Sequence, residues 1–182
     1  MAAVGVDIAP GAWLVWHPVR QPCGPAEQFV AGRRAVAAAL TAAGSADRVV
    51  PRESDGRPRF PRGFAGSISH TGPVAVAVVV PGAAAVGVDV ESAAITPRVS
   101  EFVLRERERR TLLAQYSARE LFAAKEAAFK ALCAIGTLGE FLFWQIELRQ
   151  SEDVLIASYC GVSVPVWVRS EAELSLAVAV SR

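Results

Sequence analysis

The feature that most constrains the fold is a pair of long runs of valine and alanine, Val74–Val80 and Leu174–Val180. Neither run contains a charged residue, and valine favours extended chain, so both runs predict strands and the first predicts a strand buried on both faces. A Gly-Val-Asp pattern stands in Val4–Ile8 and again in Val86–Val90. The chain is therefore predicted to form two halves, each passing from a Gly-Val-Asp strand through helix to a Val/Ala strand.

This repeat predicts an α+β fold of two similar lobes, related by a pseudo-twofold axis, with the active site at the seam between them. We place the N-terminal lobe at residues 1–82 and the C-terminal lobe at residues 83–182. The alternative is a chance match, because strands rich in valine and alanine resemble each other easily. Periodicity predicts helices at Glu27–Ala43, Arg98–Tyr116 and Ala118–Leu132, and a further strand at Phe141–Leu148.

Composition excludes several classes of protein. The formal net charge is only +1, which argues against a nucleic-acid binder with a basic face. With 52% hydrophobic and 20% charged residues, the chain is too apolar to be disordered. The longest apolar run is too short to span a bilayer, the N-terminus lacks the basic region of a signal peptide, and the three cysteines lack CxxC spacing. We therefore expect a cytoplasmic protein without nucleic-acid or membrane partners.

Lysine is rare and unevenly placed. Of 19 basic residues only Lys125 and Lys130 are lysine, and both fall on one predicted helix. Helical spacing puts Glu126 and Lys130 on a face that is otherwise apolar. The ordinary alternative is a Glu–Lys pair four residues apart, which contributes about 0.2–0.5 kcal/mol. Charges beside a core-facing surface, however, usually have partners or a ligand.

Two carboxylates stand at the end of the second Gly-Val-Asp strand. Alternation places Asp89 and Glu91 on the same face, which is a half-site for a hard divalent cation such as Mg²⁺. The alternative is a pair of solvated acids at a strand end. Glu126 could supply a third oxygen to the ion, and Lys125 and Lys130 could neutralise phosphate oxygens around it.

Further upstream, a polar junction precedes the first Val/Ala strand. Its hydroxyl groups and histidine, Ser69 and His70, suit an anionic group, although a turn with His70 satisfied by backbone is the alternative. Arg33 in the first helix and Arg52 in an arginine-rich loop could bind phosphate by forked hydrogen bonds, although a solvated basic face is the default. Together these residues predict a site for a large polyanion with a phosphoryl bond to break.

At this point the motifs resemble a known family. Gly87–Glu91, followed by Phe122–Leu132 with its Lys-Glu-Ala-x-x-Lys pattern, resembles the signature pair of the 4′-phosphopantetheinyl transferases. Gly56–Pro58 and Gly66–His70 resemble the extra motif of the larger, two-lobed monomeric members, and Phe29–Leu40 resembles their N-terminal helix. The resemblance spans about Glu27 to Leu148.

The resemblance implies an enzyme that moves phosphopantetheine from coenzyme A, its co-substrate, to a serine of an acyl or peptidyl carrier protein, as in polyketide, non-ribosomal peptide or fatty-acid synthesis. Carried over residue by residue, it implies Mg²⁺, or Mn²⁺ in its place, on Asp89, Glu91 and Glu126. Glu126, or a water held by the metal, would deprotonate the serine. It also implies phosphate contacts from Lys125, Lys130, Ser69, His70, Arg33 and Arg52.

Three features depart from the family pattern. Met1–Pro25 resembles the family only loosely, Arg57 stands where many relatives carry lysine, and Cys133–Phe141 replaces the usual tryptophan-containing loop. We also expect the clustered Arg107, Arg109 and Arg110 to help dock an acidic carrier protein. Two other functions remain as alternatives: another Mg²⁺-dependent enzyme acting on a nucleotide or diphosphate, and a non-catalytic module that binds coenzyme A or a carrier protein.

Overall fold

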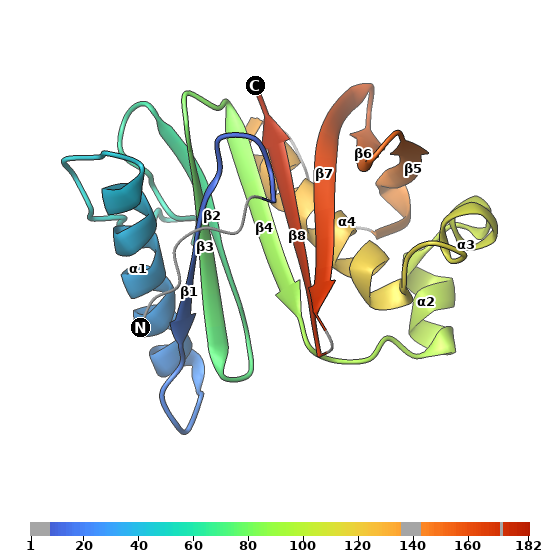
Figure 1. Cartoon of the computed structure of the whole chain (residues 1–182), viewed down its shortest axis with the longest axis horizontal. Helices are drawn as coiled ribbons and strands as arrows, with labels where there is room; N and C mark the ends of the chain where they lie inside the picture. Colours follow the sequence, from blue (N-terminus) through green and yellow to red (C-terminus); the bar gives the residue numbers. More distant parts are fainter. Residues whose placement is uncertain (1–7, 136–142, 172) are drawn as a thin grey trace.

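The computed structural model describes residues 8–135, 143–171 and 173–182 (Figure 1). Two antiparallel sheets stand beside each other, and each has a long helix packed against one face. In chain order the elements are β1 (Trp13–Pro18), α1 (Pro25–Ala42), β2 (Phe64–Thr71), β3 (Val74–Pro81), β4 (Ala85–Glu91), α2 (Pro97–Val103), α3 (Glu106–Leu112), α4 (Ala118–Ile135), the 3₁₀ turn η1 (Phe143–Gln145), β5 (Glu147–Ser151), β6 (Val154–Tyr159), β7 (Val162–Glu171) and β8 (Leu174–Ser181).

The N-terminal lobe is a three-stranded sheet of order β1-β3-β2 with α1 on one face. The helix buries a stripe of small and branched residues against the sheet, which is the pattern that its helical periodicity predicts. A glycine lets it come close: a Cβ at Gly32 would lie 2.8 Å from a side-chain carbon of Ile68 on β2. Helix and sheet are therefore in close contact where β2 passes under α1.

The C-terminal lobe is a five-stranded sheet of order β4-β8-β7-β6-β5, and α4 crosses one of its faces. The glycine of the Gly-Val-Asp pattern explains how closely they pack, since a Cβ at Gly87 would lie only 1.8 Å from the carbonyl oxygen of Ala127. Residues that alternate with Gly87 on this side of β4 therefore face α4. These residues include Asp89 and Glu91, the two predicted metal ligands.

The two Val/Ala runs meet in a core shared by both lobes. Val76, Val78 and Val80 of β3 lie in the same buried cluster as every second residue of β8, which are Leu176, Val178 and Val180. The intervening residues of each strand face the helix of their own lobe. Both strands are thus buried on both faces, as was predicted for Val74–Val80 alone, and the α+β two-lobed fold is confirmed. The lobes differ in size, however, with three strands against five.

Three local predictions need correction. The stretch Arg98–Tyr116 forms two short helices, α2 and α3, because Leu104 and Arg105 adopt extended backbone between them. The strand expected at Phe141–Leu148 is confirmed only at its end, since residues 143–145 form η1 and β5 begins at Glu147, while positions 141–142 lie outside the described residues. The Ser-His segment is part of strand β2 rather than a junction or turn. The earlier Gly-Val-Asp strand falls, up to Asp7, outside the described residues.

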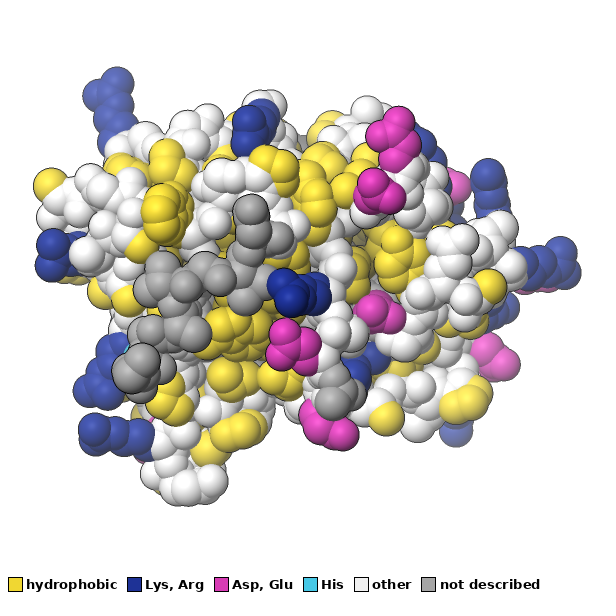
Figure 2. Space-filling view, in the orientation of Figure 1, with side chains coloured by type: hydrophobic (Ala, Val, Ile, Leu, Met, Phe, Trp, Pro, Cys, Tyr) yellow, Lys and Arg dark blue, Asp and Glu magenta, His cyan; other side chains and the backbone are white. Residues whose placement is uncertain are grey.

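The surface agrees with a chain of near-neutral charge. On the face shown in Figure 2, most lysine and arginine side chains project from the rim of the molecule, with acidic side chains among them. None of the helices in the described part of the chain is both long and apolar enough to cross a membrane.

Candidate active site

The seam brings three predicted residues from three elements into contact. Lys130 of α4 places its Nζ 2.7 Å from Oδ1 of Asp89 on β4, and Ser69 of β2 donates to the same oxygen at 2.8 Å. The Lys130 ammonium also donates to the carbonyl oxygen of Val88 at 2.9 Å. Asp89 is buried, whereas the Lys130 side chain keeps 29% of its surface exposed. The partly exposed ammonium of Lys130 is therefore held by the buried carboxylate of Asp89.

The three predicted carboxylates share one electrostatic environment. Burial, followed by the negative charges of Asp89 and Glu126, raises the pKa of Glu91 to about 7. Burial also raises the pKa of Glu126, while the nearby Lys130 charge opposes that rise. The second oxygen of Asp89, Oδ2, is buried without a hydrogen-bond partner among the described residues. An orphaned carboxylate oxygen is costly, and a cation would satisfy it.

These carboxylates fit a hard metal ion by their chemistry. They supply only oxygen ligands, which Mg²⁺ prefers, and their mutual repulsion is the kind that a divalent cation relieves. Within the described ranges, however, no three Asp, Glu, His or Cys side chains are gathered closely enough to hold an ion as they stand. The assignment of Asp89, Glu91 and Glu126 as metal ligands thus stays a prediction.

Two adjoining cavities run from α1 to α4 across the seam. The larger, about 590 Å³, is lined by Arg33, Arg52 and His70 among others, and the smaller, about 380 Å³, is lined by Lys130, Phe129 and Cys133 among others. The walls that both cavities share are Arg52, Gly56, Pro58 and Ile68. We call the two cavities together the seam groove.

The larger cavity carries unneutralised positive charge. Burial and the positive charge of Arg52 lower the pKa of Arg33, whose guanidinium carbon lies 4.7 Å above the ring centre of Phe29. Neither arginine forms an ion pair with a carboxylate in the part of the chain that the structure describes. Two cations that face one cavity without an acid are the arrangement expected where an anion binds.

Ser69 and His70 do not act together in this geometry. Successive residues of a strand point to opposite faces, so His70 lines the larger cavity while Ser69 points to Asp89. Ser69 therefore belongs with the Asp89–Lys130 cluster. The resemblance implied phosphate contacts for both residues, but strand alternation separates their side chains, so a single phosphate shared by both is not supported by their positions.

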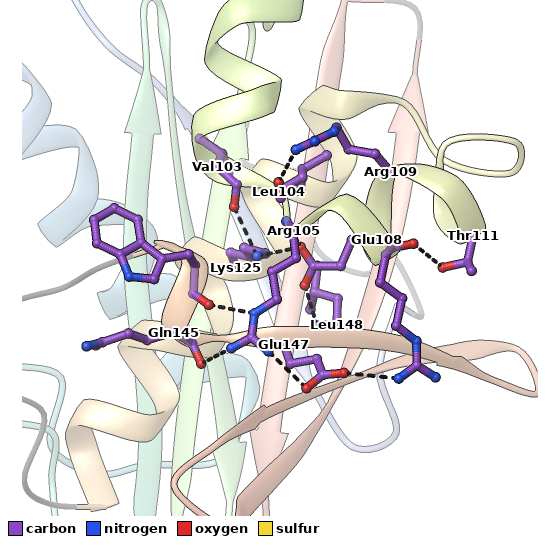
Figure 3. Close-up of polar contacts among 12 residues, drawn as sticks. Val103, Leu104, Arg105, Glu108, Arg109, Thr111, Lys125, Gln145, Glu147 and Leu148 are labelled. Carbon is purple, nitrogen blue, oxygen red and sulfur yellow. Dashed lines mark hydrogen bonds and ion pairs between the residues drawn. The ribbon is translucent and has the colours of Figure 1, made fainter.

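Lys125 is not brought to the seam groove. Its side chain is 0% exposed and its Nζ lies 2.7 Å from Oε2 of Glu108, an α3 carboxylate that is itself 1% exposed (Figure 3). Burial lowers the pKa of Lys125, and the adjacent Glu108 charge opposes that shift. A phosphate in the groove cannot reach an ammonium enclosed in this way. The expected phosphate contact of Lys125 is therefore not supported by its position.

Several relevant side chains were not singled out by sequence reasoning. Glu108 is an acid in a charged helix, and nothing in its spacing marks it as buried. Arg119 donates to the Ser175 hydroxyl at 2.9 Å, and its positive charge opposes part of the rise in the pKa of Glu91. Arg57, noted only as a departure from lysine, donates to the carbonyl oxygen of Cys133 at 2.9 Å and so links the N-terminal lobe to the end of α4.

The three clustered arginines differ in their availability. Arg109 donates to the carbonyl oxygens of Leu104, at 2.6 Å, and Glu101, at 3.2 Å, so it braces α2 and α3. Arg107 and Arg110 have side chains that are 80% and 76% exposed, each near a glutamate. Of these three arginines, Arg107 and Arg110 therefore remain as exposed basic groups on α3, at what we call the α3 edge of the molecule.

Comparison with protein families agrees with this arrangement. Residues 26–80 match the model of the 4′-phosphopantetheinyl transferase N-terminal domain, and residues 85–180 match that of the 4′-phosphopantetheinyl transferase superfamily. No curated protein matches the chain. The second match alone covers more than half of the chain, from the start of β4 to the last but one residue of β8. The chain therefore belongs to the 4′-phosphopantetheinyl transferase superfamily and is an enzyme that transfers 4′-phosphopantetheine from coenzyme A to carrier proteins.

Proposed function

We propose that coenzyme A lies along the seam groove, with its nucleotide phosphate at the larger cavity and its diphosphate beside Lys130. The observation that carries this proposal is the distribution of charge along the groove. Arg33, Arg52 and His70 line one end, and the exposed part of Lys130 lies at the other. A polyanion with two separated phosphate groups has the matching pattern.

We further propose that Asp89, Glu91 and Glu126 hold Mg²⁺, with Mn²⁺ as a substitute. The orphaned Oδ2 of Asp89 and the raised pKa values of Glu91 and Glu126 support this assignment. When bound, the ion would neutralise charge on the diphosphate and favour its cleavage.

The side chains of the chain would then perform two tasks. Lys130 stabilises the phosphate under attack, because its compact ammonium is exposed enough to meet a phosphate oxygen. Glu126, one turn before Lys130 on α4, accepts the proton of the carrier serine as the general base. The serine oxygen forms the new bond to phosphorus, and the bond to the adenosine 3′,5′-bisphosphate leaving group breaks.

The lobes would divide this work. Residues 1–82 would supply the nucleotide contacts and residues 83–182 the metal and the transfer chemistry, within one monomer. We propose that an acidic carrier protein docks at the α3 edge, where Figure 2 shows basic side chains projecting from the rim. Arg107 and Arg110 are exposed arginines there. Positive charges on a docking surface speed association with an acidic partner.

Mass spectrometry tests the proposal directly. An apo carrier protein, incubated with the enzyme, coenzyme A and Mg²⁺, should gain the mass of phosphopantetheine, and a panel of carriers identifies the pathway served. EDTA should stop the reaction and added Mg²⁺ should restore it. If no carrier in the panel gains mass, an enzyme acting on another nucleotide or diphosphate becomes the better account; if a carrier binds without gaining mass, a binding module does.

A further inference from the structure

The ion pair between Lys125 and Glu108 ties four separate segments together inside the C-terminal lobe (Figure 3). Lys125 of α4 also donates to the carbonyl oxygen of Val103, at the end of α2, at 3.0 Å. Glu108 accepts the backbone N–H of Arg105, just before α3, and that of Leu148 in β5, both at 2.7 Å. One buried pair therefore connects α2, α3, α4 and β5.

Arg105 extends this connection outwards. Its guanidinium donates to the carbonyl oxygens of Trp144, at 2.6 Å, and Gln145, at 3.1 Å, in η1. It also pairs with the carboxylate of Glu147 at 3.0 Å. The segment from α2 to α3 is thus fastened both to α4 and to the chain that enters β5.

Apart from Lys125, the buried side of α4 consists of two leucines near its ends, Leu121 and Leu132, and of alanine between them: Ala123, Ala124, Ala127, Ala128 and Ala131. Alanine allows close approach but offers no long side chain to interlock with a neighbour, so an alanine face resists sliding and rotation weakly. A buried pair with demanding geometry can supply the missing specificity of register.

The register of α4 matters because the same helix carries Glu126 and Lys130. At 3.6 residues per turn, side chains five positions apart point about 140° away from each other. Lys125 accordingly reaches Glu108 on one side of the helix while Lys130 reaches Asp89 on the other. A rotation that breaks the first contact would also move the second.

We propose that Lys125 is a positioning residue: together with Glu108 it sets the rotation and height of α4, and so places Glu126 and Lys130 against β4. This inference rests on the proposed roles of Glu126 and Lys130. Lys125 does not touch coenzyme A. Its loss should therefore reduce turnover without weakening the binding of coenzyme A.

The test is a double-mutant cycle of Lys125→Met, Glu108→Gln and the combined variant in the full-length chain, assayed well below the melting temperature of each. We expect kcat per folded molecule to fall roughly 10- to 100-fold in both single variants, as a displacement of about 1 Å can cause. The KM for coenzyme A should stay within about twofold. The combined variant should lose no more than the worse single variant, because one shared contact is removed.

Hydrogen exchange gives a readout that does not depend on activity. The Leu148 and Arg105 amides, both donors to Glu108, should exchange faster in Glu108→Gln. Arg109→Lys is the control, because it perturbs the same α2–α3 segment through carbonyl contacts alone and should leave kcat within about twofold. If a single variant fails to fold, the combined variant and the surviving single variant still report the KM.

The outcomes separate cleanly. A raised KM for coenzyme A in Lys125→Met, additive with the effect of Glu108→Gln, would overturn the proposal in favour of direct phosphate contact. Faster exchange with unchanged kcat per folded molecule would overturn it in favour of a purely structural pair. If the wild-type enzyme transfers nothing to any carrier, the proposed site chemistry is wrong. In that case the hydrogen-exchange data still show whether the Lys125–Glu108 pair holds α2, α3, α4 and β5 together.

Discussion

The two lysines of α4 share a helix and a residue type but occupy opposite environments. Lys130 keeps part of its surface at the seam groove and pairs with Asp89, whereas Lys125 is fully enclosed with Glu108. Each has a carboxylate at 2.7 Å, so the contact distance does not distinguish them. Exposure does, because only an ammonium within reach of solvent can exchange its protein contacts for those of a phosphate. Two lysine–carboxylate contacts of the same length can thus have different roles: the Lys130–Asp89 pair lies where substrate can reach it, and the Lys125–Glu108 pair stabilises the fold.

The largest effect should come from the carboxylate that the two lysines flank. Glu126→Gln removes the proposed base and metal ligand but keeps nearly the same shape, so kcat should fall by roughly 10²–10⁴-fold with the fold intact. Circular dichroism and the mass-shift assay together measure this. Full activity in Glu126→Gln would show that the metal-site assignment is wrong.

Lys130→Arg should have the next largest effect. The charge stays, but a planar fork replaces a compact ammonium at a site where Nζ meets Asp89, Val88 and Ser69 together. We expect turnover to fall roughly 10- to 100-fold with a normal melting temperature, in keeping with misplaced reacting groups. Wild-type turnover in this variant would mean that any cation suffices there.

Reversing the charge of the exposed arginines should have a smaller effect, and it should change only the interaction with the carrier protein. The double variant Arg107→Glu/Arg110→Glu should raise the KM for the carrier protein several-fold and leave the KM for coenzyme A unchanged. The double variant Arg62→Glu/Arg169→Glu, at exposed positions outside α3 and β5, is the control for the same change of net charge. An unchanged KM for the carrier protein would remove the α3 edge as the docking surface.

The smallest effect concerns stability without metal. Because the pKa of Glu91 is raised to about 7, its neutral form favours the folded state below pH 4.5, and that advantage is lost as the pH rises through 7. In EDTA the melting temperature should therefore decline by a few degrees between pH 5 and 8, and Mg²⁺ should reverse the decline. Glu91→Gln should flatten this dependence. A wild-type melting temperature indifferent to both pH and Mg²⁺ would argue against the carboxylate cluster as the metal site.

Much of this arrangement could be predicted from the sequence, for physical reasons. A run such as Val74–Val80 has no polar face, so the sequence predicts a strand that is buried on both sides. Helical spacing likewise predicts that Glu126 and Lys130 lie on one side of α4. The role of Lys125 could not be predicted, because its partner Glu108 comes from a separate helix with no apolar signal. Similarly, Ser69 and His70 are adjacent in the chain, and only the strand geometry of β2 shows that they face different groups.

The central claim is that the seam groove side of α4, and not its buried side, receives coenzyme A. Calorimetric titration of coenzyme A with Mg²⁺ into matched variants Lys130→Met and Lys125→Met tests it most directly. The account predicts binding weakened at least tenfold in Lys130→Met and changed less than about twofold in Lys125→Met, since a charge-assisted hydrogen bond contributes about 1.5–3 kcal/mol. Equal weakening in both variants, or weakening in Lys125→Met alone, would contradict it.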